Sequence, residues 1–158
     1  MRMYIWLALL IAAVTYVIVG LATLDRSSND AQIRSMIGRT VSSIQKRDLG
    51  GTILCVSKSY KDSSGTNYDR LRLLAAQALR VEREYTARAQ IKRIDVHANT
   101  ATVYLHVSVT AVDGGPIYSR NLTLRLAKED GRHALLIPVK VWRVVSVDGL
   151  AIDMQDEL

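Results

Sequence analysis

The sequence predicts an α+β protein in which an N-terminal transmembrane helix precedes one domain of three helices and a four-stranded antiparallel sheet. Three observations support this fold class. Residues 3–24 carry no charge, residues 27–80 repeat apolar side chains at helical spacing, and residues after Val81 alternate apolar with polar side chains. A chain of 158 residues is long enough for about one domain. We expect an anchor at 1–26, the domain at 27–146 and an acidic C-terminal tail at 147–158.

The uncharged segment predicts a membrane anchor. About 20 apolar residues span a hydrocarbon core of roughly 30 Å, and Tyr4 and Trp6 stand where an interfacial aromatic belt would lie. A cleaved secretory signal is the alternative, with Gly20 and Ala22 as small residues at a cleavage site. The apolar run is longer than a signal peptide requires, which favours a retained anchor. We therefore expect a single-pass protein of the bacterial inner membrane with a periplasmic domain.

Charge and cysteine content limit the classes of partner. The formal net charge is +6, and every Lys and Arg lies at or before Arg143. Four acids follow that position: Asp148, Asp153, Asp156 and Glu157. A basic domain next to a membrane favours anionic lipid headgroups or an acidic protein surface as partner, and a periplasmic location makes nucleic acid an unexpected one. A single Cys55 excludes a disulfide framework.

Three helices are predicted before residue 80. The first follows N-cap candidates at 27–30, and its apolar residues are Ile33, Ile37, Val41 and Ile44. A second pattern begins at Asp48 and continues through Leu49, Ile53, Val56 and Tyr60. The first two helices are expected to meet at a kink near 46–51, because the paired Gly50 and Gly51 weaken a continuous helix. Asn67 or Asp69 can cap a third helix, whose buried side is expected to hold Leu71, Leu74, Ala75 and Ala78.

Four strands are predicted after Val81. A bulge is expected at Arg93 and Ile94, and turns are expected at 98–100, 113–115 and 129–131. Pro138 cannot donate to a ladder, so the last strand is expected at a sheet edge. The side chains predicted to face the helices are all apolar: Ala87, Ala89, Ile91, Val103, Leu105, Val107, Val109, Leu122, Leu124, Leu126, Leu135, Ile137, Val139 and Val141.

Two pairs of segments resemble the nuclear transport factor 2-like superfamily of cone-shaped domains. They are residues 46–49 with 56–65, and residues 101–104 with 126–131, within a match that covers roughly 31–145. The resemblance implies a curved sheet wrapped around helices, as in ketosteroid isomerases, polyketide cyclases and many non-catalytic binding modules. An anchor followed by one such domain is also similar in layout to inner-membrane assembly proteins of type IV secretion systems.

The residues that could support chemistry in the cone are few. An isomerase of this fold requires a base and oxyanion donors inside an apolar cavity, and no residue of the predicted inner face can ionise. Candidates at the mouth of the cone are Asp48, Tyr60, Tyr68 and Arg120. We expect no cofactor and no metal site, because His97, His106 and His133 are accompanied by one cysteine and no clustered carboxylates.

The opposite face of the predicted sheet mixes cations with large aromatic side chains, which are enriched at protein interfaces. Its candidate partner-binding residues are Arg88, Tyr104, His106, Arg125, Lys140 and Trp142. The sequence therefore predicts a non-catalytic membrane-anchored module, either an accessory subunit of a membrane protein complex or a homo-oligomer. A small-ligand carrier or isomerase-like enzyme that uses the apolar cone is the alternative.

Overall fold

The computed structural model describes residues 11–15, 19, 27–80, 84–133 and 137–150. It confirms an α+β fold with helices α2, α3 and α4 followed by a four-stranded sheet in the order β1-β2-β3-β4. Most of the predicted anchor lies outside the described residues, and none of the described helices combines the length and apolarity that crossing a membrane requires.

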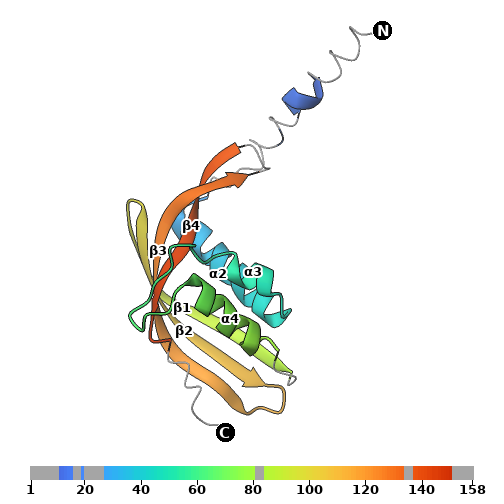
Figure 1. The fold of residues 1–158 in the computed structure, drawn as a ribbon, viewed down its shortest axis with the longest axis vertical. Helices are drawn as coiled ribbons and strands as arrows, with labels where there is room; N and C mark the ends of the chain where they lie inside the picture. Colours follow the sequence, from blue (N-terminus) through green and yellow to red (C-terminus); the bar gives the residue numbers. More distant parts are fainter. Residues whose placement is uncertain (1–10, 16–18, 20–26, 81–83, 134–136, 151–158) are drawn as a thin grey trace. The chain divides into compact units, whose positions relative to one another are not determined.

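The chain divides into two compact units. One contains residues 1–27 and 129–141, and the other contains residues 28–128 and 142–158. The second unit holds the three helices, which lie together on one face of β1 and β2 (Figure 1). The residues that line the apolar cavity also belong to this second unit.

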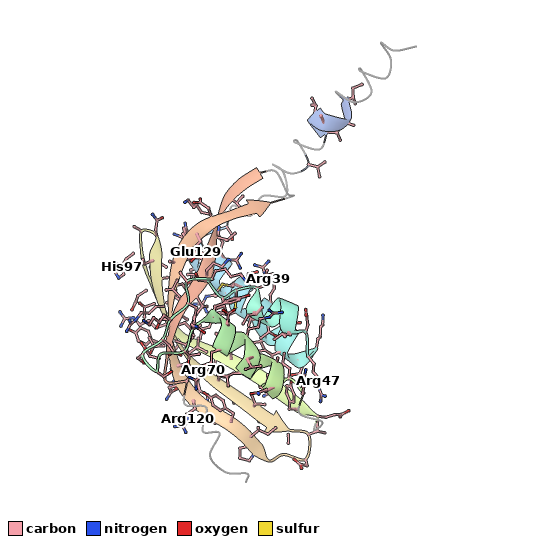
Figure 2. All side chains as sticks on the ribbon, viewed as in Figure 1. Arg39, Arg47, Arg70, His97, Arg120 and Glu129 are labelled. Atoms are coloured by element: carbon pink, nitrogen blue, oxygen red, sulfur yellow. The ribbon has the colours of Figure 1, made fainter. Side chains whose placement is uncertain are left out.

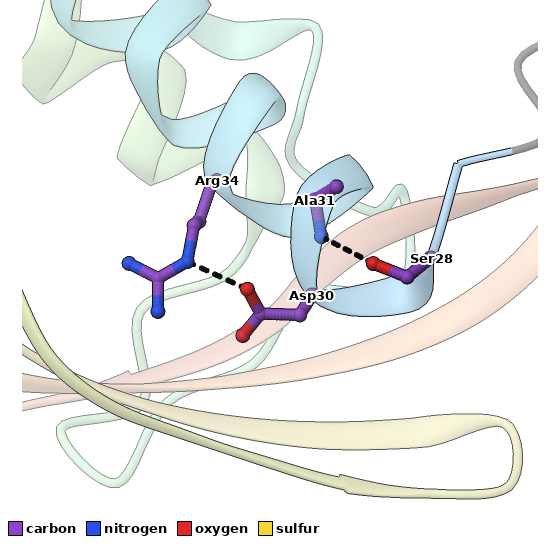
Figure 3. A network of polar contacts seen from close by, with 4 residues as sticks. All are labelled: Ser28, Asp30, Ala31 and Arg34. Atoms are coloured by element: carbon purple, nitrogen blue, oxygen red, sulfur yellow. Dashed lines mark hydrogen bonds and ion pairs between the residues drawn. The ribbon is translucent and has the colours of Figure 1, made fainter.

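Helix α2 (Asn29–Gln45) begins as the N-cap candidates predict. The Ser28 Oγ accepts a hydrogen bond from the Ala31 backbone N–H at 3.3 Å, and the Arg34 Nε lies 2.6 Å from the Asp30 carboxylate (Figure 3). An N-cap of this kind contributes about 1 kcal/mol to helix stability. The buried residues of α2 are Ile33, Met36 and Ile37, so the predicted apolar stripe faces the core.

The second predicted helix is much shorter than expected. Helix α3 (Leu49–Ile53) has Asp48 at its N-cap and ends before Val56. The chain that follows pairs instead with Val144, a residue of the last strand of the sheet. The Val144 N–H donates to the Cys55 carbonyl at 2.8 Å, and the Ser57 N–H donates to the Val144 carbonyl at 2.9 Å. This long-range pairing takes the backbone groups that a longer helix would have used.

Helix α4 (Tyr68–Ala78) begins at Asn67, whose Oδ1 accepts a hydrogen bond from the Arg70 N–H at 3.0 Å. The residues predicted on the buried side of α4 are less buried than expected. No residue of α4 is fully buried, Leu71 and Leu74 are half-buried, and Ala78 is exposed. Helix α4 therefore packs against the core through half-buried side chains, Tyr68 and Leu71, rather than through fully buried ones.

Strands β1 (Tyr85–His97) and β2 (Thr100–Ala111) pair antiparallel, as predicted, with Ala89 opposite Val107 and Ile91 opposite Leu105. A bulge is present before Val96 as expected, but the register shifts between Ile91 and Arg93, just before the predicted position at Arg93 and Ile94. The turns at 98–99 and 112–115 lead into β2 and β3 as predicted. The buried core beneath the helices includes Val103, Leu105, Leu122 and Leu126, and Figure 2 shows His97 at the β1–β2 turn and Arg120 near the opposite end of the sheet.

Two predictions about the last strands are wrong. Strand β3 (Pro116–His133) continues through the turn expected at 129–131, because Gly131 lies against Val141 as a cross-strand neighbour: a Cβ there would come 3.0 Å from its methyl group. In β4 (Ile137–Asp148), Trp142 and Val144 are buried, so the predicted phase of this strand is reversed there. Strand β4 does lie at the edge of the sheet, as Pro138 predicts.

Gly149 closes β4 in a conformation that only glycine adopts without strain. Its φ is +89°, and a Cβ would stand 2.8 Å from the Asn121 carbonyl oxygen. We expect Gly149→Ala to lower the free energy of unfolding by about 2 kcal/mol, because left-handed strain and a backbone clash add.

Gly114 provides the matched control, since its φ is also +89° but nothing lies within 4 Å of its Cβ position. Gly114→Ala is expected to cost about 1 kcal/mol in urea unfolding. Equal costs at the two positions would contradict a close approach at Gly149.

Candidate functional site: the two faces of the sheet

The inner face of the sheet and helix α2 surround an apolar cavity of about 150 Å³. Met36 and Val41 line it from α2, and Ala89, Leu105 and Leu124 line it from the sheet. Among its described lining residues only Thr40, Cys55 and Arg88 carry polar side-chain atoms, and none is a carboxylate or an imidazole. Arg88 is an exposed residue that alternates in β1 with the half-buried Ala87 and Ala89, so its charged group is not directed into the cavity. A cavity of this size is at the lower limit for a small organic ligand, since an engineered cavity of roughly 150 Å³ binds benzene.

Cys55 is the nucleophile type closest to this cavity, but its environment favours the neutral thiol. Burial raises the pKa of Cys55 and outweighs the opposing effects of a Thr40 hydrogen bond and the Arg143 charge. The Sγ donates to the Thr52 carbonyl at 3.5 Å. Because the thiolate is the reactive form, this thiol is suited to packing rather than to nucleophilic attack.

None of the four residues proposed at the mouth of the cone is among the residues that line the cavity. Asp48 lies at the N-cap of α3, and Tyr68 opens α4 with the Lys58 Nζ 3.7 Å from its ring centroid. Arg120 is an exposed residue of β3. Tyr60 is buried in the loop between α3 and α4, so these four side chains come from four different parts of the fold and none of them lines the cavity.

The Tyr60 loop contains a buried carboxylate that sequence reasoning missed. The Asp62 Oδ1 accepts the Ser64 N–H, the Ser64 hydroxyl and the Thr66 N–H at 2.7–3.0 Å, and the Oδ2 accepts the Tyr60 hydroxyl at 3.1 Å. Burial acts to raise the pKa of Asp62, but these hydrogen bonds outweigh it and lower the pKa below its usual range. Burial, followed by the Asp62 charge, raises the pKa of Tyr60. Every carboxylate oxygen is used, so this is a structural network.

The outer face of β1–β3 is polar and positively charged. We use "outer face" for the side chains of these strands that point away from the helices: Arg88, Gln90, Lys92, Arg93 and Asp95 of β1, Thr102, Tyr104, His106 and Ser108 of β2, and Ser119, Asn121, Thr123 and Arg125 of β3. Four of the predicted partner-binding residues therefore share one surface: Arg88, Tyr104, His106 and Arg125.

A hydrogen-bond network crosses the centre of the outer face. The Asn121 Oδ1 accepts from the Lys92 Nζ at 2.8 Å and lies 3.1 Å from the His106 Nδ1. An amide oxygen only accepts, so the His106 Nδ1 carries the proton and its Nε2, 3.2 Å from the Ser119 Oγ, is free to accept from that hydroxyl. Neither Asn121 nor Ser119 was predicted as a site residue, because their role depends on the pairing of β2 with β3.

Two predicted partner-binding residues do not belong to the outer face. Trp142 is only 5% exposed and packs in the core, with the Lys128 Nζ 5.1 Å from its ring centroid. The prediction that Trp142 faces outward failed because both alternating sets of positions in this part of β4 hold apolar residues, so alternation does not identify the buried side. Lys140 lies in the unit of residues 1–27 and 129–141, where its Nζ is 2.6 Å from the Asp130 carboxylate. Among the residues that the structure describes, no group of three or more His, Cys, Asp or Glu could hold a metal.

No family model and no curated protein matches the sequence. Solved structures share its fold at low identity. An NTF-2-like protein of unknown function from Shewanella oneidensis is 13% identical over 76% of this chain and 97% of its own, with a TM-score of 0.61. A cystatin-like protein of unknown function from Nostoc punctiforme is 14% identical over 75% and 87%, with a TM-score of 0.59.

A third structure, from Thiobacillus denitrificans, is assigned as a calcium/calmodulin-dependent protein kinase type II association domain. It is 8% identical over 73% of this chain and 91% of its own, with a TM-score of 0.57. These likenesses establish the NTF2-like, or cystatin-like, fold of the chain, and a shared fold leaves the function open.

Proposed function

We propose that this chain is a non-catalytic binding module, held at a membrane by residues 3–24, that binds a protein partner through its outer face. The observation that carries the proposal is the division of chemistry between the two faces of the sheet. The described lining of the cavity offers no carboxylate or imidazole, whereas the outer face exposes Arg88, Arg125 and Tyr104. General acid–base catalysis requires an ionisable group beside the reacting atoms, and Arg and Tyr are enriched at interface hot spots.

The partner is either a subunit of a membrane protein complex or a second copy of the chain. The Thiobacillus denitrificans structure assigned as an association domain supports an assembly role, because a domain of this fold is there linked to association. A membrane anchor would add to this role, since it confines the domain near neighbouring membrane proteins and raises the effective concentration of both partners.

A small-ligand carrier is the second candidate, and the apolar cavity favours it. About 150 Å³ beside Ala89 and Leu105 could hold a compact apolar molecule. An isomerase-like enzyme would in addition require an acid or base, and the described lining of the cavity supplies neither a carboxylate nor an imidazole.

Site-specific photo-crosslinking tests the proposed function. With benzoylphenylalanine at position 104, on the outer face, we expect a discrete crosslinked species from intact membranes. The same group at position 73, on α4 and 59% exposed, is expected to give none. Arg125→Ala should reduce the yield at position 104 several-fold, since interface arginines rank among hot spots. A yield equal at both positions, or unchanged by Arg125→Ala, would contradict the outer face as the binding surface.

A further inference from the structure

Some cations of the outer face are paired with carboxylates and others are not. The Arg93 Nε lies 2.7 Å from the Asp95 carboxylate, and an Arg125 guanidinium nitrogen lies 2.9 Å from the Asp148 carboxylate. Lys92 is bonded to the neutral Asn121 amide, and within the described part of the chain no acidic side chain pairs with Arg88. The β1 side of the face therefore presents two cations, Arg88 and Lys92, that no acidic side chain of the described residues balances.

A second copy of the chain fits these two cations poorly. A twofold interface places the same patch of both subunits together, so Arg88 and Lys92 of one copy would face a patch that is itself positively charged. Like charges placed opposite one another across an interface oppose association and exclude wrong partners. The one acid of the outer face, Asp95, is already paired with Arg93, and Asp148 of β4 is paired with Arg125 of the face.

An anionic membrane surface also fits the pattern less well than a protein does. A lipid headgroup layer attracts cations through its surface potential without fixing their positions. A protein surface can place acids opposite Arg88 and Lys92 and leave the paired acids untouched. It can also use the Asn121 amide, the Ser119 hydroxyl and the exposed Tyr104 ring for directional contacts, which fix orientation as well as charge.

We infer that the outer face binds an acidic surface of a different protein, whose carboxylates pair with Arg88 and Lys92. The His106–Asn121–Ser119 network supports this role because it holds Lys92 in place across three strands before a partner arrives. Less side-chain entropy is then lost on binding. The inference rests on the proposed function and names the chemistry of its partner.

A decaglutamate peptide serves as the probe, titrated into the full chain in neutral phosphatidylcholine nanodiscs and followed by NMR. We expect amide shifts around Arg88, Lys92, His106 and Ser119, and a several-fold weaker affinity when NaCl is raised from about 50 to 200 mM. The double variant Arg88→Gln/Lys92→Gln should weaken binding about tenfold, because it removes both unbalanced charges. Decaglutamine should not bind.

The matched control is Arg39→Gln/Arg70→Gln, which removes the same charge from exposed positions on α2 and α4. It should change the affinity less than about twofold, because both residues lie on helices that cover the other face of β1 and β2, and salt screens the effect of distant charges. Equal weakening by the two double variants would overturn the inference, since binding would then follow net charge alone. Tighter binding to phosphatidylglycerol nanodiscs than to the peptide, lost in Arg88→Gln/Lys92→Gln, would overturn it in favour of a membrane.

Self-association and the proposed function are tested separately. A dimer detected by light scattering that disappears in Arg88→Gln/Lys92→Gln would overturn the inference in favour of a second copy. If the crosslink at position 104 forms while decaglutamate fails to bind, the acidic character of the partner is wrong and the proposed function stands. If neither the crosslink nor the peptide complex forms, both are wrong.

Discussion

Trp142→Ala is expected to lower the free energy of unfolding by about 4 kcal/mol, the largest effect of any single substitution considered. The side chain is 5% exposed and belongs to the buried cluster that includes Ile33 and Val144. Truncation removes the indole from this cluster and leaves a cavity that rigid strands cannot fill. It also removes the contact of the Lys128 ammonium with the ring face. Chemical unfolding of the variant and the parent chain measures the difference.

Trp142→Phe separates the contribution of volume from that of the indole N–H. The Trp142 Nε1 is buried and has no hydrogen-bond partner among the described residues, so its removal relieves an unsatisfied donor. We expect Phe to cost less than half of what Ala costs. Tyr104→Ala is the surface control: at 40% exposed, it should cost less than about 1 kcal/mol. A stability of Trp142→Ala within about 1 kcal/mol of the parent chain would contradict a core position for this tryptophan.

The contrast between Trp142 and Tyr104 shows where sequence reasoning was sufficient. Along β1 and β2 every second residue is polar or charged, so one register alone can face the core, and the predicted faces are confirmed. In β4 both registers are apolar, at Val141 and Trp142 and again at Val144 and Val145. Alternation then cannot assign a face, and the volume of the tryptophan decides which register is buried.

The early end of α3 and the unpredicted hydrogen bonds of Asn121 and Ser119 have a common cause: both depend on pairing between distant segments of the chain. Val56 and Tyr60 continue the helical spacing that begins at Leu49, yet the backbone of this segment pairs with β4, the last strand of the chain. Local periodicity carries no information about such a pairing. Asn121 and Ser119 likewise become site residues only once His106 is known to lie opposite Asn121.

The Asp62 turn, in contrast, could have been predicted from the sequence. An Asp followed by Ser, Ser and Gly is typical of an Asx turn.

Asp62→Ala is expected to lower the free energy of unfolding by about 3 kcal/mol. The carboxylate accepts hydrogen bonds from the Tyr60 hydroxyl, the Ser64 N–H and hydroxyl, and the Thr66 N–H. Tyr60 and Thr66 are 2% and 7% exposed, so water cannot easily replace the lost acceptor. Urea unfolding at neutral pH measures the loss. Ser63→Ala is the control in the same loop: Ser63 is exposed, so its truncation should cost less than about 0.5 kcal/mol.

The dependence on pH distinguishes the charge of Asp62 from its shape. Its pKa in the folded chain is lower than its ordinary value of 3.8, so its stabilising contribution is complete above that value and is lost as the pH falls through the lower, folded pKa. The free energy of unfolding of the parent chain should therefore approach that of Asp62→Asn in acid. Tyr60 titrates in alkali: its raised pKa favours the neutral phenol, so its contribution to the free energy of unfolding is present below pH 10.0 and falls above it. Because Asp62→Asn removes the charge but keeps the shape, a stability difference that stays constant from about pH 7 to about pH 3 would show that the carboxylate charge contributes nothing to the loop.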